Sequence, residues 1–484
     1  MMKRPFLLQV LIGASLILFS CTQQTAPPTD IPALPVVPSE QQFEYQQLEF
    51  VGFLHFTVNT FTDKEWGYGD EDPAIFNPTE LDAEQWVRAA KAGGMRELIL
   101  TAKHHDGFCL WPSAYTEHDI ASSPYQNGEG DLVRELVEAC RKHGLKVGLY
   151  LSPWDRNHAD YGKPEYLTYY RNQLRELLTN YGEINEIWFD GANGGDGYYG
   201  GANEVRTIDR KTYYDWPTTI ALVKELQPDI KIFSDAGPDL RWVGNEHGHA
   251  GETFWSPIDS SQLVIGGSDS DYLNTGEPDG NKWIIGQCDV SIRPGWFYHA
   301  DQDSLVKSPE ELLDIYYKSV GRNGVLLVNL PPDRRGLIHE NDVQSLREFR
   351  EILDQTFATN LANRAVISTS QQSSSPFPRK HLTDGDVETY WATGDSSTSA
   401  EIILEFAADT EFDHVVLQEP IRFGQRVSSF AIDVQQGDDW ETVFEGTTIG
   451  YKRITRFNPV SASKIRVRIL ESMAPVALSE VGVY

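Results

Sequence analysis

The chain has 484 residues, of which 40% are hydrophobic, and its formal net charge at pH 7 is -30. This length can bury more than one hydrophobic core, and a barrel with a smaller second domain fits the usual domain sizes. The charge excludes nucleic acid as a ligand, because the surface would repel a phosphate backbone and no Lys/Arg cluster offsets it. The chain also has 12 Trp, 21 Tyr and 22 Phe. We expect most of these rings to fill the interior and some to stack on flat apolar ligand faces.

The N-terminal segment predicts export and attachment to a lipid. Residues 1–20 carry Lys3 and Arg4 and then an apolar stretch too short for a stable membrane span, which is typical of a signal peptide. The segment ends in Leu18-Phe19-Ser20-Cys21, which is similar to a bacterial lipobox and would place acyl chains on Cys21. An ordinary signal peptide with an incidental cysteine is the alternative. Residues 21–44 are predicted to form a flexible tether, and we expect a protein of the bacterial cell envelope, periplasmic or on the cell surface.

Only three cysteines follow Cys21. They are Cys109, Cys140 and Cys288. An odd number at wide spacing gives neither a disulfide framework nor a Cys-x-x-Cys metal clip. We therefore expect three ordinary buried thiols.

From about residue 50, strand and helix patterns alternate along the chain. The predicted strands are 51–58, 97–101, 146–152, 186–189, 230–234, 283–289 and 325–330, and the predicted helices are 83–92, 131–143, 164–180, 213–226, 309–320 and 341–357. Residues 237–282, rich in Gly, Asp and Ser, are predicted to be long loops. The alternation implies parallel strands with helical crossovers, in a barrel or a doubly wound sheet. No Gly-x-Gly-x-x-Gly follows the first strand, which favours a (β/α)8-type barrel over residues 45–360.

The helical periods stop near residue 360, where a second domain is predicted. A polar Ser/Gln stretch at 368–375 is followed by short alternating runs, at 401–406, 414–418, 430–435, 464–469 and 477–484. Short strands separated by turns predict an antiparallel β-sandwich over residues 361–484.

Two segments of this second domain resemble the discoidin-type (factor V/VIII C-type) sandwiches, a group that includes family 32 carbohydrate-binding modules. They are Leu382-Thr383-Asp384-Gly385-Asp386 and Ala477-Leu478-Ser479-Glu480-Val481. The resemblance implies that the loop with Asp384 and Asp386 holds a structural Ca²⁺, although a plain Asx-turn accounts for it almost as well.

Polar side chains follow three of the predicted barrel strands. His55 ends the first strand, His104 and His105 end the second, and Asp190 follows the apolar run Ile187-Trp188-Phe189. The carboxyl ends of barrel strands share one rim, where catalytic groups gather. The sequence therefore predicts one polar site on that rim.

Six separated segments, in the expected order, resemble the family 29 glycoside hydrolases, the retaining α-L-fucosidases. Besides His55 they are Asn59–Gly67, Lys103–Phe108, Gly148–Asp155, Trp188–Gly191 and Gly237–Glu246. Asn59-Thr60-Phe61 and Arg241–Glu246 look more like the subgroup that cleaves α-1,3 and α-1,4 fucosyl links in branched glycans. The resemblance implies an exo-acting enzyme that releases terminal α-L-fucose from oligosaccharides or glycoconjugates by double displacement, with no cofactor.

Two carboxyl groups are the candidate catalytic pair. A retaining glycosidase holds its nucleophile and its acid/base roughly 5–5.5 Å apart. Asp190, at a rigid strand end, suits the nucleophile. Glu246 is the candidate acid/base, since partial desolvation beside Trp242 and Val243 could raise its pKa. Three competitors for the second role remain open, namely Asp235, Asp239 and Glu252.

The other predicted site residues contact substrate. His55, His104 and His105 could bind zinc instead, but adjacent histidines on one strand point to opposite faces and cannot easily share an ion. The resemblance implies hydrogen bonds to fucose hydroxyls for all three, and a purely structural role stays open for one of the adjacent pair. The remaining contacts are Glu65 and Trp66 on the sugar, Tyr150 and Trp188 in the same site, and Trp154 and Asp155 toward the aglycone.

Two rival functions remain at this stage. One is a non-catalytic carbohydrate-binding lipoprotein on a hydrolase scaffold, against which the carboxylates at 190 and 246 argue. The other is a metal-dependent barrel hydrolase. No strand-end motif lies after about residue 365, so we expect the sandwich to be dispensable for hydrolysis of small substrates.

Overall fold

The computed structural model describes residues 30–370, 377–394 and 396–484. The predicted signal peptide and Cys21 lie outside the described residues. The chain divides into residues 1–31 and a larger unit, residues 32–484, which contains the elements described below. Within the described part of the chain, no helix is long and apolar enough to cross a membrane.

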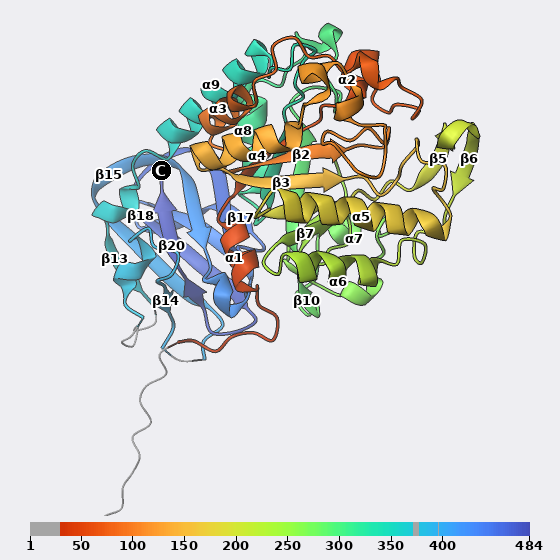
Figure 1. Cartoon of the computed structure of the whole chain (residues 1–484). Coiled ribbons are helices and arrows are strands. Elements are labelled where there is room, and N and C mark those ends of the chain that lie inside the picture. Colours follow the sequence, from red (N-terminus) through yellow and green to blue (C-terminus); the bar gives the residue numbers. More distant parts are fainter. Residues whose placement is uncertain (1–29, 371–376, 395) are drawn as a thin grey trace, which may run out of the picture. The chain divides into compact units, whose positions relative to one another are not determined.

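A closed barrel of eight parallel strands forms the first part of the large unit (Figure 1). Each strand pairs in parallel with its neighbours, in the order β1-β12-β11-β8-β7-β4-β3-β2. This confirms the predicted barrel. The strands are β1 (Phe50–Leu54), β2 (Glu97–Lys103), β3 (Lys146–Leu151), β4 (Glu186–Trp188), β7 (Lys231–Ser234), β8 (Leu240–Trp242), β11 (Ile285–Ser291) and β12 (Val325–Asn329).

Helices cover the outside of the barrel, and capping residues fix where they begin and end. The side chains of Asp82 and Asp131 accept hydrogen bonds from the first turns of α3 and α4. Gly94 and Gly144 end these two helices in the left-handed conformation. The helices are α3 (Ala83–Gly93), α4 (Leu132–His143), α5 (Pro164–Asn180), α6 (Trp216–Leu226), α8 (Pro309–Ser319) and α9 (Glu340–Thr356), close to the predicted ranges.

The strand β8 lies inside the stretch predicted to be loop. Its central residue, Arg241, is fully buried and donates hydrogen bonds to four backbone carbonyls, those of Leu273, Trp255, Ser256 and Ile284. A short strand with a buried cation does not show the apolar run that predicts a barrel strand. Residues 235–239, all of which the structure describes, form only a turn, so the connection from β7 to β8 has no helix. The connection from β8 to β11 is long and contains β9 (Pro257–Ile258), α7 (Ser270–Leu273) and β10 (Lys282–Trp283).

The glycine-rich segment after Asp190 forms a two-stranded hairpin. Its strands are β5 (Gly194–Gly197) and β6 (Glu204–Thr207), which pair antiparallel beside the C-terminal ends of the barrel strands (Figure 1). The guanidinium of Arg156 donates to the backbone oxygen and to the side chain of Asp196, both at 2.8 Å. The insertion is therefore held to the barrel rather than free.

A helix begins within the segment predicted to be a flexible tether. This helix, α1 (Glu40–Gln46), starts with a capping box between Ser39 and Gln42. Phe43 is buried, and the Gln42 amide donates to the Trp283 carbonyl at 2.8 Å. The expected tether is thus wrong from residue 40 onward, because this segment has apolar and amide groups that pack against the strand starts.

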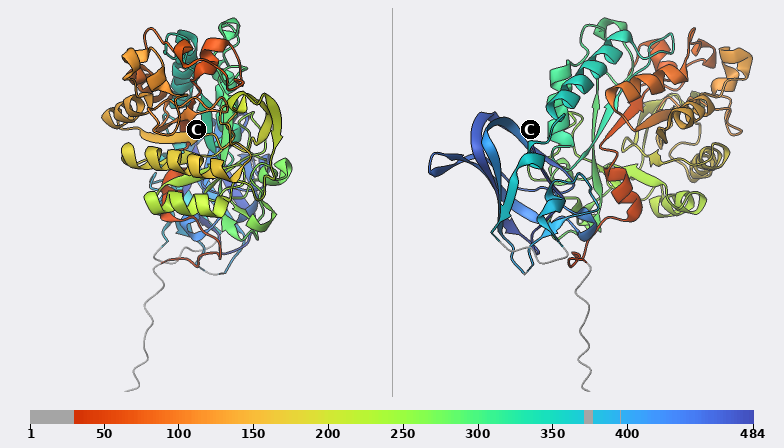
Figure 2. Two further views of the ribbon diagram at one scale, coloured as in Figure 1. Left: turned by 45° about the vertical axis from the view of Figure 1, so that its right-hand side comes forward. Right: turned by 90° about the vertical axis from the view of Figure 1, so that its left-hand side faces the viewer.

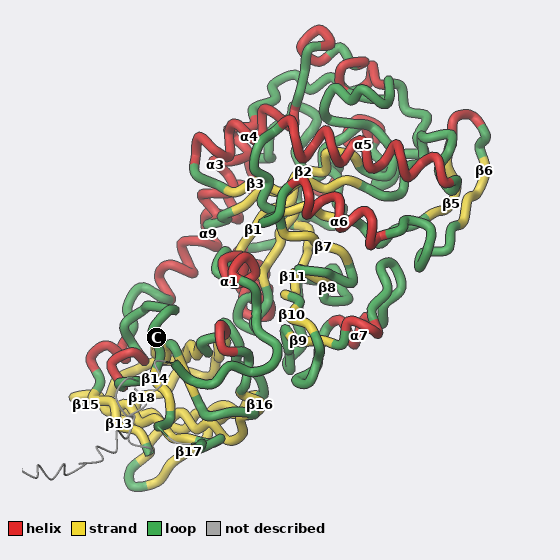
Figure 3. Tube along the Cα trace, turned by 60° about the horizontal axis from the view of Figure 1, so that its bottom comes forward, coloured by secondary structure: helices red, strands yellow, loops and turns green. Residues whose placement is uncertain are grey.

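The C-terminal domain is an antiparallel sandwich with its own core, as predicted (Figures 2 and 3). The main sheet has the order β13-β15-β18-β16-β17, with β20 paired to β15, and β14 and β19 pair separately. Several predicted runs merge into long strands with register shifts. The strands are β13 (Val366–Thr369), β14 (Trp391–Ala392), β15 (Ala400–Gln418), β16 (Val427–Gln436), β17 (Asp439–Gly446), β18 (Arg453–Ser472), β19 (Ala477–Leu478) and β20 (Glu480–Val483). The predicted linker at 368–375 therefore overlaps the end of β13.

Candidate active site

A cavity of about 260 Å³ lies at the C-terminal ends of the barrel strands. Strand ends from all around the barrel contribute to it, as the (β/α)8 architecture predicts. Its walls hold nine of the eleven predicted catalytic and substrate-binding residues. The lining residues are Phe53, His55, Glu65, Trp66, His104, His105, Tyr150, Trp188, Asp190, Ala192, Glu246, Asp289 and Trp296.

A second cavity, of about 510 Å³, adjoins the first. The two share Trp188, Asp190, Ala192, Glu246 and Asp289, so both candidate carboxylates face both spaces. A further cavity of about 530 Å³ lies at the opposite end of the barrel, beside the strand starts, and contains none of the predicted site residues. The pair of adjoining cavities is therefore the candidate active site.

Asp190 is oriented by two hydrogen bonds. Its Oδ2 accepts from the hydroxyl of Tyr150 at 3.1 Å, and its Oδ1 accepts from the backbone N–H of Ala192 at 2.6 Å. Burial, followed by the charge of Asp190, raises the pKa of Tyr150 well above its usual value, so this hydroxyl keeps its proton. The Asp190 carboxylate is thus held at the cavity wall by donors that do not titrate at neutral pH.

Glu246 lies on the loop after β8 and is exposed to solvent. Its Oε2 accepts a hydrogen bond from the indole Nε1 of Trp296 at 3.1 Å. Trp296 follows β11, so a neighbouring strand end orients this carboxylate. Asp190 and Glu246 line the same two cavities from different strands, an arrangement in which two carboxyl groups can act on one bond.

The structure places the three competitors of Glu246 in different surroundings. Asp239 pairs with Lys224 at 2.8 Å and accepts from the Ile232 N–H, away from both cavities. Glu252 pairs with Arg322 of the barrel and Arg453 of the sandwich. Asp235 lines the larger cavity, but its Oδ2 accepts from the Gly266 N–H at 2.6 Å. Burial raises the pKa of Asp235 to about 7.

His55 is held as a neutral hydrogen-bond acceptor toward the cavity. Its Nδ1 lies 2.8 Å from Oδ1 of Asn329, whose amide nitrogen donates to the carbonyl of Trp296 at 2.7 Å. The Asn329 oxygen must therefore accept, and Nδ1 of His55 carries the proton. Burial lowers the pKa of His55 to about 3, which leaves Nε2 unprotonated and able to accept from a ligand hydroxyl.

His105 has the same arrangement with different partners. Its Nδ1 lies 2.7 Å from the hydroxyl of Ser152, which donates its own proton to the carbonyl of Trp154 at 2.6 Å. Nδ1 of His105 therefore donates, and Nε2 lies 4.0 Å from Oδ2 of Asp190. Burial lowers the pKa of His105 to about 4.

His104 and His105 face the same cavity, contrary to the expected opposite faces. Their ring centroids are 4.1 Å apart, and both rings line the wall. The strand ends at Lys103, so the alternation of a strand no longer applies to the next two residues. Among the described residues, no group of three or more His, Cys, Asp or Glu side chains could hold a metal ion.

Glu65 and Trp66 form part of the cavity rim. Trp66 is 53% exposed and packs edge to face on His105 and Trp154, with ring centroids 5.3 and 5.6 Å apart. One oxygen of Glu65 accepts from the Trp296 N–H at 2.8 Å, and the other lies 2.6 Å from Nε2 of His299. Glu65 therefore joins the first βα loop to the loop after β11.

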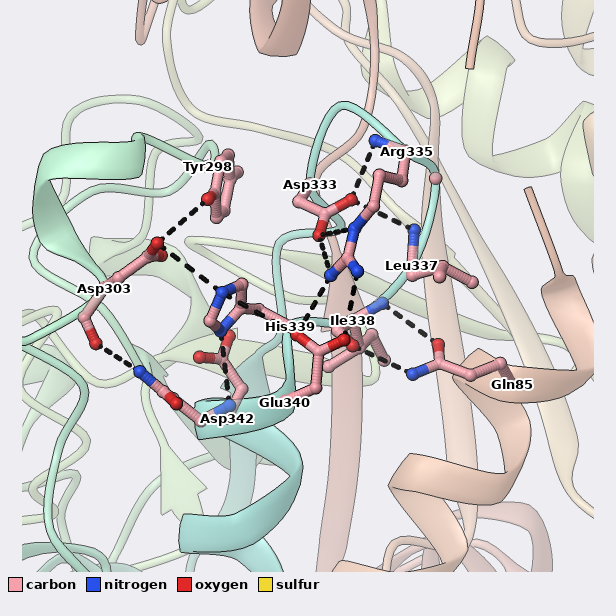
Figure 4. Close-up of polar contacts among 12 residues, drawn as sticks. Gln85, Tyr298, Asp303, Asp333, Arg335, Leu337, Ile338, His339, Glu340 and Asp342 are labelled. Carbon is pink, nitrogen blue, oxygen red and sulfur yellow. Dashed lines mark hydrogen bonds and ion pairs between the residues drawn. The ribbon is translucent and has the colours of Figure 1, made fainter. Parts of the chain in front are cut away.

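The loop after β11 is anchored to the start of α9. The buried guanidinium of Arg293 pairs with Asp342 and Asp303, each at 2.8 Å. Figure 4 shows the outer part of this network, in which Tyr298 donates to Asp303 at 3.2 Å and His339 lies 3.5 Å from the same carboxylate. These contacts fix the loop that carries Trp296.

Trp154 and Asp155 have other roles than the expected aglycone contacts. Asp155 is fully buried and pairs with Lys103 at 3.0 Å, outside both cavities. Trp154 is buried behind Trp66 and His105, and its indole donates to Tyr199 at 3.0 Å. Both side chains are therefore held by buried polar partners.

Trp188 does line both cavities, and the barrel interior fixes its ring. Its indole donates to Gln287 at 2.7 Å, and the ring stacks on Phe233 with centroids 3.9 Å apart. This contact of Gln287 was not predicted.

Sequence reasoning missed two other cavity residues, Asp289 and Trp296. Asp289 is 4% exposed and its Oδ1 has no hydrogen-bond partner among the described residues. Burial, followed by the charge of Glu246, raises its pKa well above the usual value. A carboxylate inside the apolar run Cys288-Asp289-Val290 was the available signal. Trp296 had no comparable signal, because it lies in a loop.

In the loop predicted to bind calcium, the carboxylate of Asp384 accepts hydrogen bonds from donors of the same loop. Oδ1 of Asp384 accepts from the Asp386 N–H at 3.1 Å, and the Thr389 hydroxyl donates to Asp384 at 2.8 Å. This is the Asx-turn geometry that was the alternative. Cys109, Cys140 and Cys288 are buried free thiols, as expected.

Comparison with known proteins shows the family and the two domains. Residues 36–356 match the family model described as alpha-L-fucosidase, and residues 366–481 match the F5/8 type C domain. Alpha-L-fucosidase 1 of Arabidopsis thaliana is 44% identical over 464 residues, covering 94% of this chain and 89% of the relative. The chain belongs to the α-L-fucosidase family, glycoside hydrolase family 29.

Solved structures of this family superpose on the whole enzyme. A family 29 member from an unknown rumen bacterium is 45% identical with a TM-score of 0.84, covering 94% of this chain and 78% of that one. A Ruminococcus gnavus family 29 fucosidase in complex with fucose is 35% identical with a TM-score of 0.85, covering 95% and 97%. The enzyme is thus a glycoside hydrolase, and both the α-L-fucosidase family and the discoidin-type domain are confirmed.

Proposed function

We propose that this enzyme is a retaining exo-α-L-fucosidase in which Asp190 is the nucleophile and Glu246 the general acid/base. The observation that carries the proposal is that the two carboxylates lie on different strand ends, line the same cavity and are each oriented by a donor. A retaining enzyme needs one such pair on opposite sides of the bond.

The reaction then proceeds in two steps. Asp190 attacks the anomeric carbon while Glu246 protonates the glycosidic oxygen, so the aglycone leaves and a fucosyl ester forms on Asp190. Glu246 next removes a proton from water, which attacks the same carbon and releases fucose with the starting configuration. The Tyr150 hydroxyl keeps the Asp190 carboxylate aimed at the sugar.

The neutral histidines support recognition of a hydroxylated ligand. Nε2 of His55 and Nε2 of His105 are acceptors, so each suits one sugar hydroxyl. Trp66 and Trp188 offer ring faces to the apolar side of a deoxy sugar. The fucose-bound relative supports fucose as the occupant of the smaller cavity.

The finer proposal concerns the linkage. The segments Asn59-Thr60-Phe61 and Arg241–Glu246 resemble the α-1,3/1,4 subgroup. The larger cavity adjoins Asp190 and Glu246, on the side where we place the aglycone. That space suits a second sugar next to the fucosyl link, so we propose branched glycans with 3- or 4-linked fucose as substrates. For location, we propose the bacterial cell envelope, with a lipid on Cys21.

Product stereochemistry tests the mechanism. Proton NMR during the first turnovers should show α-L-fucose before mutarotation, and β-L-fucose as the first product would overturn it. Comparing hydrolysis of trisaccharides that differ only in the linkage tests the finer proposal. Equal or faster release of α-1,2-linked fucose from an unbranched glycan would contradict it.

A further inference from the structure

We propose that the C-terminal sandwich holds the barrel loop that carries Glu246, so that residues of the sandwich position the acid/base for the reaction. This inference rests on the proposed role of Glu246. It gives the domain a part in catalysis, in place of the dispensability expected from the sequence.

The loop after β8 has little to hold its tip in place. Glu246 is exposed, and among the described residues its carboxylate has one donor, the indole of Trp296. The side chain of Asn245 closes the tip by donating to the His249 carbonyl at 2.9 Å and accepting from the His247 N–H at 3.1 Å. The position of Glu246 therefore depends on what fixes the two ends of this closed tip.

The barrel fixes the first end and the start of the second end. Val243 follows β8 directly and is fully buried. His247 forms a backbone bridge with Val290 of β11, and the Ala250 N–H donates to the Lys318 carbonyl at 2.9 Å. Val290 lies in β11 and Lys318 in α8, both of which belong to the barrel.

The sandwich fixes the second end through the main chain. The Phe254 N–H donates to the hydroxyl of Thr448 at 3.0 Å. The amide of Gln425 donates to the Phe254 carbonyl at 2.8 Å and accepts from the Ser256 N–H at 2.9 Å. Phe254 and Ser256 are fully buried in the folded enzyme, where these backbone groups take their partners from the sandwich.

A charged contact reinforces the same end. The guanidinium of Arg453, only 2% exposed, donates to the Glu252 carbonyl at 2.9 Å and pairs with its carboxylate. Arg322 of the barrel reaches the other carboxylate oxygen at 2.6 Å. Glu252 therefore joins the two domains in the segment that follows the tip, and a buried cation depends on it.

The contacting loops of the sandwich are themselves bonded to the barrel. The Asn323 side chain accepts from the Tyr451 N–H at 2.7 Å and donates to Gln425 at 3.2 Å. The Ile454 N–H donates to the Gly321 carbonyl at 3.0 Å. The sandwich thus packs next to α8 and β12. Its loops that carry Gln425 and Thr448 contact the segment after Glu246 within the same interface.

A pair of matched substitutions in the full-length enzyme isolates this role. Thr448→Val removes the acceptor of the Phe254 N–H. Thr455→Val is the control, because Thr455 is an equally buried threonine whose hydroxyl donates to the Val415 carbonyl at 3.0 Å inside the sandwich. Each change removes one buried hydrogen bond between a threonine hydroxyl and the backbone, so melting temperatures should fall similarly.

The two variants should differ in catalysis on substrates that need protonation. With a natural fucoside, whose leaving group is poor, we expect kcat of Thr448→Val to fall about tenfold, with KM little changed. With a dinitrophenyl fucoside, whose leaving group needs no proton, the first step should keep its rate. Thr455→Val should match the parent on both. Equal losses in the two variants, or equal losses on the two substrates, would overturn the proposal.

A double-mutant cycle with Glu246→Ala separates this inference from the proposed function. If Glu246→Ala alone leaves the natural fucoside reaction near normal, the acid/base assignment fails and the inference fails with it. If Glu246→Ala is severely slowed, Thr448→Val should cost nothing further in that background, because its effect passes through the missing side chain. A full additional tenfold loss there would overturn the positioning role while leaving the acid/base assignment intact.

Discussion

The hydroxyl of Tyr150 lies 3.1 Å from Oδ2 of Asp190 and donates its proton to it. The two residues come from neighbouring strands, β3 and β4, which pair in parallel up to this level. A side chain of β3 therefore orients the carboxylate that follows β4.

Tyr150→Phe should slow the reaction without unfolding the enzyme. A hydrogen bond to a charged group is worth about 1.5–3 kcal/mol, so we expect kcat/KM to fall about 10- to 100-fold. Tyr170→Phe is the matched control, since its buried hydroxyl donates to the Leu151 carbonyl at 3.0 Å and not to Asp190. Steady-state kinetics on an aryl fucoside gives both values, and equal losses would show that the Tyr150 hydroxyl does not act through Asp190.

Removing either carboxylate should have a different signature. Asp190→Ala should slow every substrate by several orders of magnitude, whatever its leaving group, because the covalent step is lost. Glu246→Ala should slow natural glycosides severely and spare the first step for good leaving groups. Added azide should then give the α-fucosyl azide from Glu246→Ala, by displacing Asp190 with overall retention, and the β-fucosyl azide from Asp190→Ala, by direct inversion, as seen by NMR. Near-normal turnover of a natural fucoside by Glu246→Ala would turn attention to Asp235.

The buried neutral His55 should make stability depend on pH. Burial lowers its pKa from the usual 6.5 to about 3, so below pH 6.5 the unfolded chain binds a proton that the folded enzyme does not. The free energy of unfolding should therefore decrease as pH falls, by up to about 1.4 kcal/mol per pH unit. Urea unfolding at pH 6.5 and 5 should show a smaller decrease for His55→Gln than for the parent. The exposed His247→Gln should change nothing, and an unchanged slope in His55→Gln would show that His55 is not the group responsible.

Asp289 should act as a neutral group at the wall between the two cavities. Burial, together with the charges of Glu246 and Asp190, raises its pKa well above the usual value, while Trp242 hydrogen-bonds to it. Asp289→Asn keeps the shape and the absence of charge, so activity near pH 6 should stay within about threefold of the parent. The parent should lose activity as pH rises and this carboxyl ionises beside the catalytic pair. The pH profile of kcat/KM should extend further to alkaline pH in the variant, and a parallel alkaline limb in both enzymes would exclude Asp289 as its cause.

Cys21→Ala tests the membrane anchor. Two acyl chains give stable attachment where one does not, so the variant should stay unprocessed or become soluble. Fractionation of cells followed by immunoblotting distinguishes these outcomes. A mature Cys21→Ala chain that still sediments with membranes would show that another feature attaches it.

The sequence predicted most of the barrel because periodic apolar patterns and capping residues are local. Helix α5 begins and ends where the pattern placed it, and α3 differs by one residue. The strand β8 was not predicted, because its central Arg241 is buried only through hydrogen bonds to carbonyls of distant segments. Such a partnership exists only in the folded chain.

The site residues likewise fall into those that the sequence predicts and those that it does not. Residues at strand ends, such as His55 and Asp190, were predictable because the barrel brings every strand end to one rim. Trp296 and the sandwich contacts to Phe254 were not, because loop conformation decides them. Asp155 looked equally suitable in sequence, yet the pairing with Lys103 turns it inward.

The helix α1 enters the barrel at the strand starts, where Tyr45 donates to Glu186 at 2.7 Å and the Gln46 amide donates to the Asn323 carbonyl at 3.1 Å. The sugar cavity opens at the strand ends. Helix α1 and the candidate catalytic site therefore lie at opposite ends of the barrel. A substrate at the rim is separated from α1 by the full length of the strands, so the packing of α1 closes the strand starts without narrowing access to the sugar cavity.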